Sequence, residues 1–131
     1  MLKEETAQAS SPTTVLIVED DPDVRTVTKL LLEQEGCSVI EAGDGLEAVH
    51  IAVVRSLDLI LMDINMPIMD GIEATRQLRQ DDRTRAVPIV IVSADTDERL
   101  RKAIDAGCNG CVKKPLLPDN FKDTLEKYVH S

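Results

Sequence analysis

The sequence predicts an α/β protein of one domain, in which an open, doubly wound sheet of parallel strands carries helices on both faces. Short apolar runs alternate with segments of helical spacing from residue 14 onward. Several of these runs are continuously apolar, which is typical of strands buried on both faces of a parallel sheet. A length of 131 residues suits one domain with a substantial core and is too short for two.

The apolar runs predict five strands, at residues 14–18, 38–42, 57–62, 87–93 and 110–113. Each strand is followed by a segment in which apolar residues recur at helical spacing, so a strand and then a helix occur five times in succession. The residues expected on the inner faces of these helices are, in order, Val24, Val27 and Leu31; Leu46, Val49 and Val53; Ile72, Thr75 and Leu78; Leu100, Ala103 and Ile104; and Phe121, Leu125 and Tyr128.

Residues at the predicted helix ends agree with this assignment. Prolines suited to a first helical turn and glycines suited to C-terminal caps occur at Pro22, Pro118, Gly36 and Gly107. The sequences DGLEA at 44–48 and DGIEA at 70–74 are nearly identical, but nothing else recurs at that interval. We interpret both as capping boxes, in which the Asp bonds the third helical amide and the Glu reaches back to the cap.

Composition and charge limit the classes of partner. The net charge is −9, so the surface repels phosphate backbones and anionic lipid, and we expect no direct nucleic-acid binding. No segment has the roughly 20 apolar residues of a membrane span, and residues 1–13 lack the apolar stretch of a signal peptide. We therefore expect no membrane association, a cytoplasmic location, and a disordered tail over residues 1–13.

Three cysteines are present, and this odd number argues against a disulfide framework and fits a reducing compartment. Cys108 and Cys111 form a C-x-x-C sequence, CNGC. Neither a second pair nor a histidine cluster supplies further zinc ligands, and no helix start follows the pair as in redox motifs. Two interpretations stay open, a metal or redox site and two small buried or half-buried thiols, and the second is favoured.

Polar residues follow four of the five predicted strands. Ligands of open α/β sheets bind at the carboxyl ends of the strands, so these positions are the candidates for a site. The residues there are Glu19, Asp20 and Asp21 after the first strand, Asp63 after the third, Ser93 at the end of the fourth, and Lys113 and Lys114 after the fifth. If the first and third strands are neighbours, Glu19, Asp20 and Asp63 converge at one edge.

Three carboxylates so close together cannot all stay ionised without a cation, and oxygen ligands favour Mg²⁺. Asp63 could then act as a nucleophile toward phosphorus, with Ser93 and a lysine ammonium bound to phosphoryl oxygens. Each residue also has an ordinary structural explanation. Asp20 or Asp21 could cap the helix that begins at Pro22, Ser93 could serve a turn, and Lys114 could be a solvated surface charge.

The chain resembles the receiver domain of the response regulators of two-component signalling. The resemblance covers residues 14–129, in order and with the family's spacing. It rests on VLIVEDD at 15–21, LILMDINMPIMDGIEATRQLR at 59–79, VPIVIVSA at 87–94 and KKP at 113–115. It implies a flavodoxin-like fold with strand order 2-1-3-4-5, and a receiver domain over residues 14–131. It also implies a phosphoprotein of a bacterial phosphorelay that is a signalling module and no enzyme beyond its own phosphorylation and dephosphorylation.

By this resemblance Asp63 matches the aspartate that takes a phosphoryl group from the phosphohistidine of a sensor histidine kinase or histidine phosphotransfer protein. The implied ligands of Mg²⁺, or Mn²⁺, are Glu19, Asp20, Asp63 and the backbone carbonyl of Asn65. Ser93 matches the switch hydroxyl of the family, and Lys114 matches the lysine that contacts the phosphate. Lys113 is then a bystander, and the Lys114–Pro115 peptide bond is expected to be cis.

Phosphorylation is expected to switch the interactions of the fourth helix, fifth strand and fifth helix, and homodimerisation on phosphorylation is one outcome the family allows. One position departs from the family. Cys111 stands three residues before Lys114, where the family usually has an aromatic ring that changes rotamer on activation. A thiol cannot swing as a ring does, so we expect Cys111 to fill the ring's slot without that motion.

Rival interpretations differ in their chemistry. A flavin-binding domain could share the strand order, but EDD at 19–21 would repel its phosphate. An aspartate-nucleophile phosphatase of the haloacid dehalogenase type would turn over phosphomonoesters, and DIN at 63–65 loosely resembles its first motif. A degenerate receiver would dock without being phosphorylated. MDGIEATRQLR is most similar to receivers of hybrid histidine kinases, so the chain is expected to be either a stand-alone receiver or part of a larger protein.

Overall fold

A five-stranded parallel sheet forms the centre of the protein. The computed structural model describes residues 12–129, so most of the predicted tail, residues 1–11, lies outside the described residues. The strands are β2 (Thr14–Val18), β3 (Ser38–Ala42), β4 (Leu59–Met62), β5 (Ile89–Ser93) and β6 (Gly110–Lys113). Their order across the sheet is β3-β2-β4-β5-β6, which confirms the predicted order 2-1-3-4-5.

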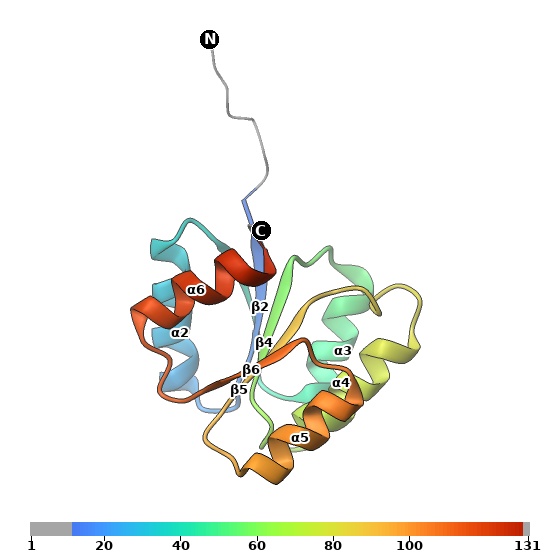
Figure 1. The fold of residues 1–131 in the computed structure, drawn as a ribbon. Coiled ribbons are helices and arrows are strands. Elements are labelled where there is room, and N and C mark those ends of the chain that lie inside the picture. Colours follow the sequence, from blue (N-terminus) through green and yellow to red (C-terminus); the bar gives the residue numbers. More distant parts are fainter. Residues whose placement is uncertain (1–11, 130–131) are drawn as a thin grey trace.

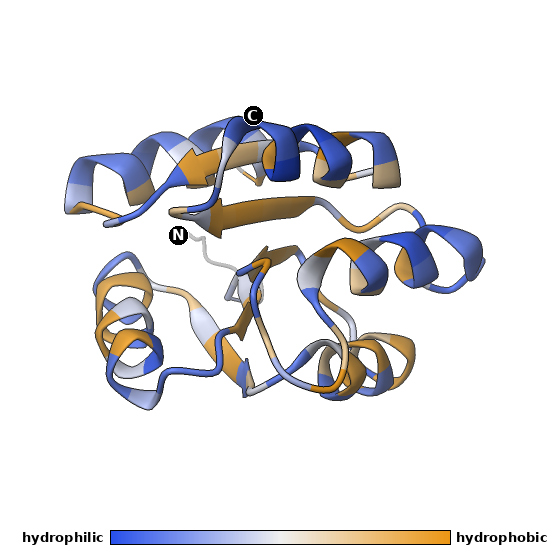
Figure 2. Cartoon of the chain, turned by 90° about the horizontal axis from the view of Figure 1, so that it is seen from below, coloured by the Kyte–Doolittle hydropathy of each residue, from blue (hydrophilic) through white to orange (hydrophobic). Residues whose placement is uncertain are grey.

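Helices cover both faces of the sheet, as a doubly wound fold requires (Figure 1). They are α2 (Pro22–Gln34), α3 (Gly45–Val54), α4 (Gly71–Gln80), α5 (Asp97–Ala106) and α6 (Pro118–Tyr128). Helices α2 and α6 lie on one side, and α3, α4 and α5 lie on the other. Figure 2 shows the strands as a hydrophobic middle layer between helices that carry both hydrophilic and hydrophobic residues. Two buried apolar clusters result, one on each face of the sheet.

Two strands begin two residues later than predicted, at Leu59 and Ile89. Asp58 precedes the first of these, and its side chain accepts a hydrogen bond from Thr14 N at 2.8 Å, so it closes the end of the β2–β4 ladder. Pro88 precedes the second and has no N–H to donate to the ladder. The prediction from hydropathy includes the apolar residues Leu57 and Val87, because hydropathy does not show at which residue backbone pairing between strands begins.

The inner faces of α4 and α6 are predicted correctly, whereas those of α2 and α3 are predicted only in part, because Leu31 and Val49 pack against the apolar clusters but their predicted neighbours do not. On α2, Val24 and Val27 are 37% and 57% exposed, and Leu32 is the buried residue. On α3 the buried positions are Gly45, Ala48 and Ala52 in place of the larger residues beside them. The small side chains let α3 pack closely on α4 and the loop before it, since a Cβ on Gly45 would overlap the carbonyl oxygen of Met69 and lie 3.1 Å from Ala74 Cβ of α4. On α5, Leu100 and Ala103 are buried as predicted, but Ile104 is 55% exposed.

The predicted helix ends are largely confirmed. Pro22 and Pro118 begin their helices, and Gly36 and Gly107 follow α2 and α5 with positive φ angles of 86° and 121°. The side chains of Asp44 and Asp70 accept hydrogen bonds from the amides of Glu47 and Glu73, each at 2.8 Å. The reciprocal bonds to the cap amides are not formed, because Glu47 accepts from Gly43 N, one residue before the cap, and Glu73 pairs with Arg76. Both predicted capping boxes are therefore only half formed.

We predict that Gly71→Ala destabilises the fold. A Cβ at Gly71 would overlap the backbone carbonyl oxygen of Asp63, so the loop after β4 must shift, and we expect the free energy of unfolding to fall by about 1–3 kcal/mol. Gly43→Ala is the matched control, because its nearest atom is Arg25 Nη1 at 3.7 Å. Urea denaturation compares the two, and equal stabilities would show that the close approach at Gly71 is not a constraint.

Candidate functional site

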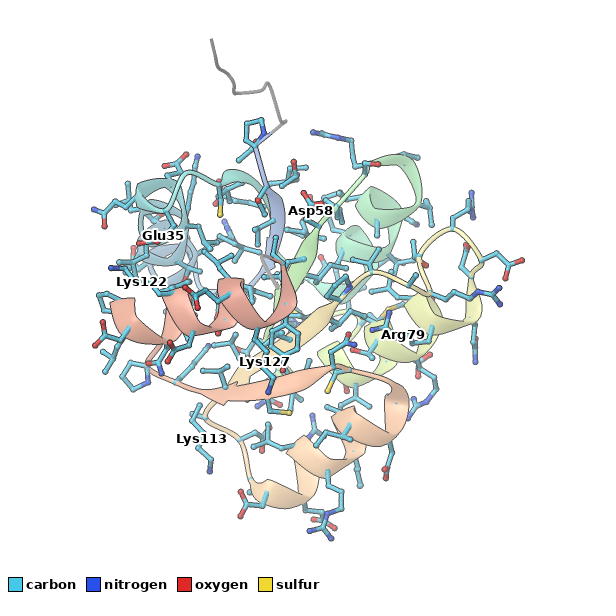
Figure 3. All side chains as sticks on the ribbon, turned by 45° about the horizontal axis from the view of Figure 1, so that its top comes forward. Glu35, Asp58, Arg79, Lys113, Lys122 and Lys127 are labelled. Atoms are coloured by element: carbon cyan, nitrogen blue, oxygen red, sulfur yellow. The ribbon has the colours of Figure 1, made fainter. Side chains whose placement is uncertain are left out.

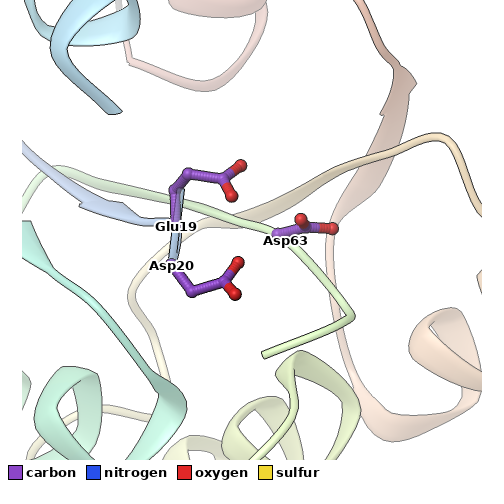
Figure 4. Close-up of side chains that lie close together, drawn as sticks. All are labelled: Glu19, Asp20 and Asp63. Atoms are coloured by element: carbon purple, nitrogen blue, oxygen red, sulfur yellow. The ribbon is translucent and has the colours of Figure 1, made fainter. Parts of the chain in front are cut away.

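Three carboxylates meet at the carboxyl edge of the sheet. Glu19 and Asp20 follow β2, and Asp63 follows β4. The two strands are neighbours with Val18 opposite Met62, so their carboxyl ends lie side by side. One oxygen from each of the three carboxylates lies within 4.8 Å of the others (Figure 4). Within residues 12–129 this is the only group of three or more potential metal-ligating side chains, and the predicted convergence is confirmed.

The backbone holds two of these carboxylates in the interior. Glu19 is 5% exposed and Asp63 is 9% exposed, whereas Asp20 is exposed. Asp63 N–H donates to Val18 O at 3.0 Å, which extends the ladder by one residue. The carboxylate of Asp63 accepts from Ile64 N–H at 2.7 Å, and that of Glu19 accepts from Asp21 N–H at 3.1 Å. Burial raises the pKa of Glu19, and hydrogen bonding opposes this shift only in part.

Lys114 joins the two buried carboxylates. Its Nζ lies 2.6 Å from Glu19 Oε1 and 2.9 Å from Asp63 Oδ2. Burial by itself lowers the pKa of Lys114, but the hydrogen bonds to Glu19 and Asp63 together raise it, so the side chain is held as an ammonium ion. The Lys114–Pro115 peptide bond is cis, as expected. The alternative interpretation of Lys114 as a solvated surface charge is therefore wrong.

Lys113, directly before it, has the opposite character. Its side chain lies at the surface of the protein (Figure 3). The ammonium of Lys113 faces Asp97 at 3.3 Å, and these two side chains are 68% and 87% exposed. An ion pair between such exposed groups contributes little to stability. The two adjacent lysines therefore separate into one that is bound to the carboxylates and one that lies at the surface.

Ser93 and Asn65 lie near the carboxylates but form no described hydrogen bond with them. Ser93 is 1% exposed, and its Oγ accepts from Asp95 N–H at 3.1 Å. Asn65 is exposed, and its side-chain amide donates to Asp95 at 2.7 Å. The Thr96 amide first, and then Asn65, hold the pKa of Asp95 below its usual value. The roles predicted for the Ser93 hydroxyl and for the Asn65 carbonyl stay predictions.

The sequence left open whether Asp20 or Asp21 caps the helix that begins at Pro22, and the structure shows that Asp21 does. It is the N-cap of α2, and its side chain accepts from Asp23 N–H at 2.9 Å and from Val24 N–H at 3.4 Å. Asp20 does not cap the helix, and its carboxylate belongs to the acidic cluster with Glu19 and Asp63.

Two arginines near the site were not predicted from the sequence. Arg25 on α2 donates from Nη1 to the carbonyl oxygen of Glu19 at 2.7 Å. Arg99 on α5 lies 3.6 Å from Asp95, 3.9 Å from Asp70 and 3.4 Å from the side-chain oxygen of Asn65. Both arginines lie within helices, and nothing in their sequence spacing indicates that the chain turns them toward these loops.

An apolar cavity of about 550 Å³ adjoins the carboxylates. It lies between α2 and the segment after β6, and we call it the α2 groove. Its walls include Val24, Val27 and Leu31 of α2 and Leu116 after β6, and Asp63 and Lys114 are also among its lining residues. The groove explains why Val24 and Val27 are exposed, since this part of α2 does not close onto the sheet.

The donor set of the cluster fits a divalent cation. Its three carboxylates carry more negative charge than the single ammonium of Lys114 balances, and carboxylate oxygens are the ligands that Mg²⁺ prefers. Asp63 also combines a nucleophilic oxygen with a neighbouring cation. The fold and this site together define a flavodoxin-like α/β domain with an acidic centre at the carboxyl edge of its sheet.

Comparison with known proteins identifies the family. Residues 15–126 match the response regulator receiver domain, and the chain belongs to this family. It is 35% identical over 122 residues to the polar-differentiation response regulator DivK of Brucella anthropi, a match that covers 90% of this chain and 97% of DivK. It is 36% identical over 127 residues to the sensor protein EvgS of Escherichia coli, of which the match spans only 10%.

Solved structures agree with this assignment. The receiver domain of the sensor histidine kinase PA1611 of Pseudomonas aeruginosa, determined with magnesium coordinated in its active-site cleft, has a TM-score of 0.87 and 32% identity. That match covers 92% of this chain and all of the other. The receiver domain of Ssk1 of Saccharomyces cerevisiae, determined with the histidine phosphotransfer protein Ypd1, has a TM-score of 0.81 and 30% identity, and the match covers 89% of this chain and 88% of that chain.

The protein is therefore a receiver domain of two-component signalling, with the Glu19, Asp20 and Asp63 cluster at its active site. It is a signalling module and not an enzyme in the ordinary sense. The family match leaves the haloacid dehalogenase interpretation without support. Among the described residues, no helix has the length and apolar character needed to cross a membrane.

We predict that Lys114→Ala destabilises the protein more than Lys113→Ala does. Removal of Lys114 leaves two buried carboxylates without their cation, and we expect the free energy of unfolding to fall by about 1–3 kcal/mol. Lys113→Ala removes only an exposed ion pair and should change it by less than about 0.5 kcal/mol. Chemical denaturation at neutral pH measures both, and equal effects would mean that Lys114 does not stabilise the buried carboxylates.

Proposed function

We propose that the protein takes a phosphoryl group from a phosphohistidine onto Asp63. The observation that carries this proposal is the position of the Asp63 carboxylate, 2.9 Å from Lys114 Nζ and beside two further carboxylates. An oxygen of Asp63 forms a bond to phosphorus, the bond between phosphorus and the histidine nitrogen breaks, and its electron pair stays on the imidazole. Lys114 offers its ammonium to an oxygen of the transferred group.

Ser93 is proposed to bind a second phosphoryl oxygen. Its Oγ accepts a hydrogen bond from Asp95 N–H, which leaves the hydroxyl proton available for donation. Ser93 is buried at the end of β5, next to β4 and thus to Asp63. The Ser93 hydroxyl can move toward a phosphoryl group on Asp63 and bring the segment after β5 with it.

Mg²⁺, or Mn²⁺, is proposed to bind at the same edge. Its ligands would be carboxylate oxygens of Glu19, Asp20 and Asp63 and the backbone carbonyl of Asn65. When bound, the ion supplies positive charge that neutralises the oxygens of the transferred phosphoryl group. The three converging carboxylates support this, as does the magnesium ion coordinated in the PA1611 receiver.

A sensor histidine kinase or a histidine phosphotransfer protein is the proposed donor, and the α2 groove is its proposed docking surface. Val24 and Val27 of α2 line the groove and are 37% and 57% exposed, and the groove has Asp63 and Lys114 among its lining residues. A partner seated there can hold its phosphohistidine over Asp63. The related Ssk1 receiver forms a complex with the histidine phosphotransfer protein Ypd1.

The proposed output surface is formed by α5, β6 and α6. Lys114 directly follows β6, so a phosphoryl group that draws Lys114 away from Glu19 would act on the end of this strand. The helices α5 and α6 flank β6 on opposite faces of the sheet (Figure 1). A displacement of β6 therefore reaches both of them.

We predict that a small phosphodonor modifies the wild type in the presence of Mg²⁺ and does not modify Asp63→Asn. The amide oxygen and nitrogen of Asn cannot attack phosphorus as the carboxylate does. Intact mass spectrometry with acetyl phosphate, and amide NMR with beryllofluoride, measure the modification. Asp21→Asn is the matched control, because Asn also caps helices and Asp21 lies beside the cluster without belonging to it.

A wild-type spectrum unchanged by beryllofluoride at saturating Mg²⁺ would contradict phosphorylation. It would favour a degenerate receiver that only docks. Loss of modification in Asp21→Asn as well would mean that the charge of the loop, and not Asp63 itself, determines the reaction.

We also predict that Val27→Asp slows phosphoryl transfer from a histidine phosphotransfer protein at least ~10-fold, because a charge in the groove opposes an apolar contact. Transfer from acetyl phosphate should not change, since Asp63 is untouched. Val54→Asp, 76% exposed on α3 on the other face of the sheet, is the control and should react like the wild type. Equal rates for all three proteins with the phosphotransfer donor would place the docking surface elsewhere.

A further inference from the structure

Cys108 and Cys111 lie next to each other at the start of β6. Their sulfur atoms are 4.0 Å apart, although only Asn109 and Gly110 separate them in the chain. Cys108 is 8% exposed, and Cys111 is half-buried with its sulfur 4.0 Å from the carbonyl oxygen of Leu100 on α5. Both thiols are free. The favoured sequence interpretation, two small buried or half-buried thiols, is correct as a description of burial.

The loop between the two cysteines is held from several sides. The side-chain oxygen of Asn109 accepts hydrogen bonds from Arg79 Nη2 at 2.7 Å and from Ile89 N–H at 2.8 Å. Its backbone N–H donates to Ile89 O at 2.7 Å, and its carbonyl accepts from the Tyr128 hydroxyl at 3.3 Å. Arg79 on α4 also donates from Nε to the carbonyl oxygen of Gly107 at 2.8 Å (Figure 3). The fold therefore keeps the two sulfurs together, which favours reaction between them over reaction with other thiols.

We propose that Cys108 and Cys111 are a reversible dithiol/disulfide site that exchanges with small disulfides of the glutathione class. The half-buried Cys111 thiolate attacks one sulfur of the small disulfide, forms a mixed disulfide and releases one small thiolate. The Cys108 sulfur, after loss of its proton to solvent, attacks the Cys111 sulfur and releases the second small thiolate. The protein loses two protons and two electrons, and the small disulfide gains them and is reduced to two thiols.

The environment of each sulfur supports this order of steps. Cys111 is the more exposed of the two and is the one that a small disulfide can reach. Burial, and then the neighbouring Cys111, raise the pKa of Cys108 to about 12, so Cys108 is a poor first nucleophile. The Cys108 sulfur lies 4.0 Å from the Cys111 sulfur that carries the mixed disulfide. Because the two are so close, even a small thiolate fraction of Cys108 can complete the exchange.

A metal site at the same place is less well supported. Two thiols leave a zinc ion two ligands short. Among the described residues, the acidic cluster around Asp63 is the only group of three or more potential ligands, and neither cysteine belongs to it. Disulfide exchange needs only the two sulfurs.

Cys37 provides a matched control within the same chain. It is 7% exposed, close to the 8% of Cys108, and burial raises its pKa as well. It lies in the apolar cluster under α2 and α6, whereas Cys108 lies in the cluster on the other face of the sheet. Among the described residues, Cys37 is therefore a buried thiol that has no second thiol beside it.

The test equilibrates the full chain with reduced and oxidised glutathione under exclusion of air, followed by alkylation and peptide mapping by mass spectrometry. We expect one internal disulfide that maps to Cys108 and Cys111, with Cys37 free. We expect the Cys111–glutathione adduct to accumulate at least ~10-fold more in Cys108→Ser than in the wild type, because only the wild type can displace it. Cys37→Ser should behave like the wild type.

Three results would overturn the proposal: three free thiols at all glutathione ratios, an adduct at Cys111 equally abundant in the wild type and in Cys108→Ser, or a disulfide that forms only in urea. Because mapping of the wild type decides the first and third, the test does not depend on how well the variants fold. Phosphorylation of Asp63 is not needed for any of these readouts, so failure here would leave the proposed function unaffected.

Discussion

The contact of Lys114 with Glu19 and Asp63 is the constraint on which the rest of the structure depends. Two carboxylates lie at the ends of strands whose buried residues are all apolar, and burial of such groups costs free energy unless a cation faces them. Lys114 supplies that cation from the far end of the chain, with Nζ within 2.9 Å of both. It can do so only if β2, β4 and β6 end at the same edge of the sheet, which the parallel order provides.

This arrangement places a reactive carboxylate at the meeting point of two surfaces. On one side, α2 leaves an apolar groove that has Asp63 and Lys114 among its lining residues. Across the sheet, the loops that carry Asn65 and Asp95 are held by Arg99 of α5. A change in charge at Asp63 therefore acts both on the α2 groove, which is the proposed docking surface of the phosphoryl donor, and on α5 and β6, which belong to the proposed output surface. The cation of Lys114 links these parts because it belongs to the segment after β6.

Much of the fold and the site was predictable from sequence. Continuous apolar strands and the residues at their ends identified the sheet, the acidic convergence and the lysine, since the period of a buried strand and the position of its last residue are local properties. The faces of α2 and α3 were predictable in this way only in part. Val24 and Val27 are apolar yet line an open groove, and Gly45, Ala48 and Ala52 are small yet form the packed face of α3. Hydropathy does not show where two helices pack so closely that only small residues fit between them.

The sequence by itself determined the family, the strand order implied by it, and which residue types gather at the active edge. Only the tertiary structure decided that Asp21 caps α2, that Arg25 and Arg99 reach the site, and that the sulfurs of Cys108 and Cys111 lie 4.0 Å apart. The physical reason is that these are contacts between groups distant along the chain or across a loop. Their distances follow from how helices and loops pack, and no local pattern of residues encodes them.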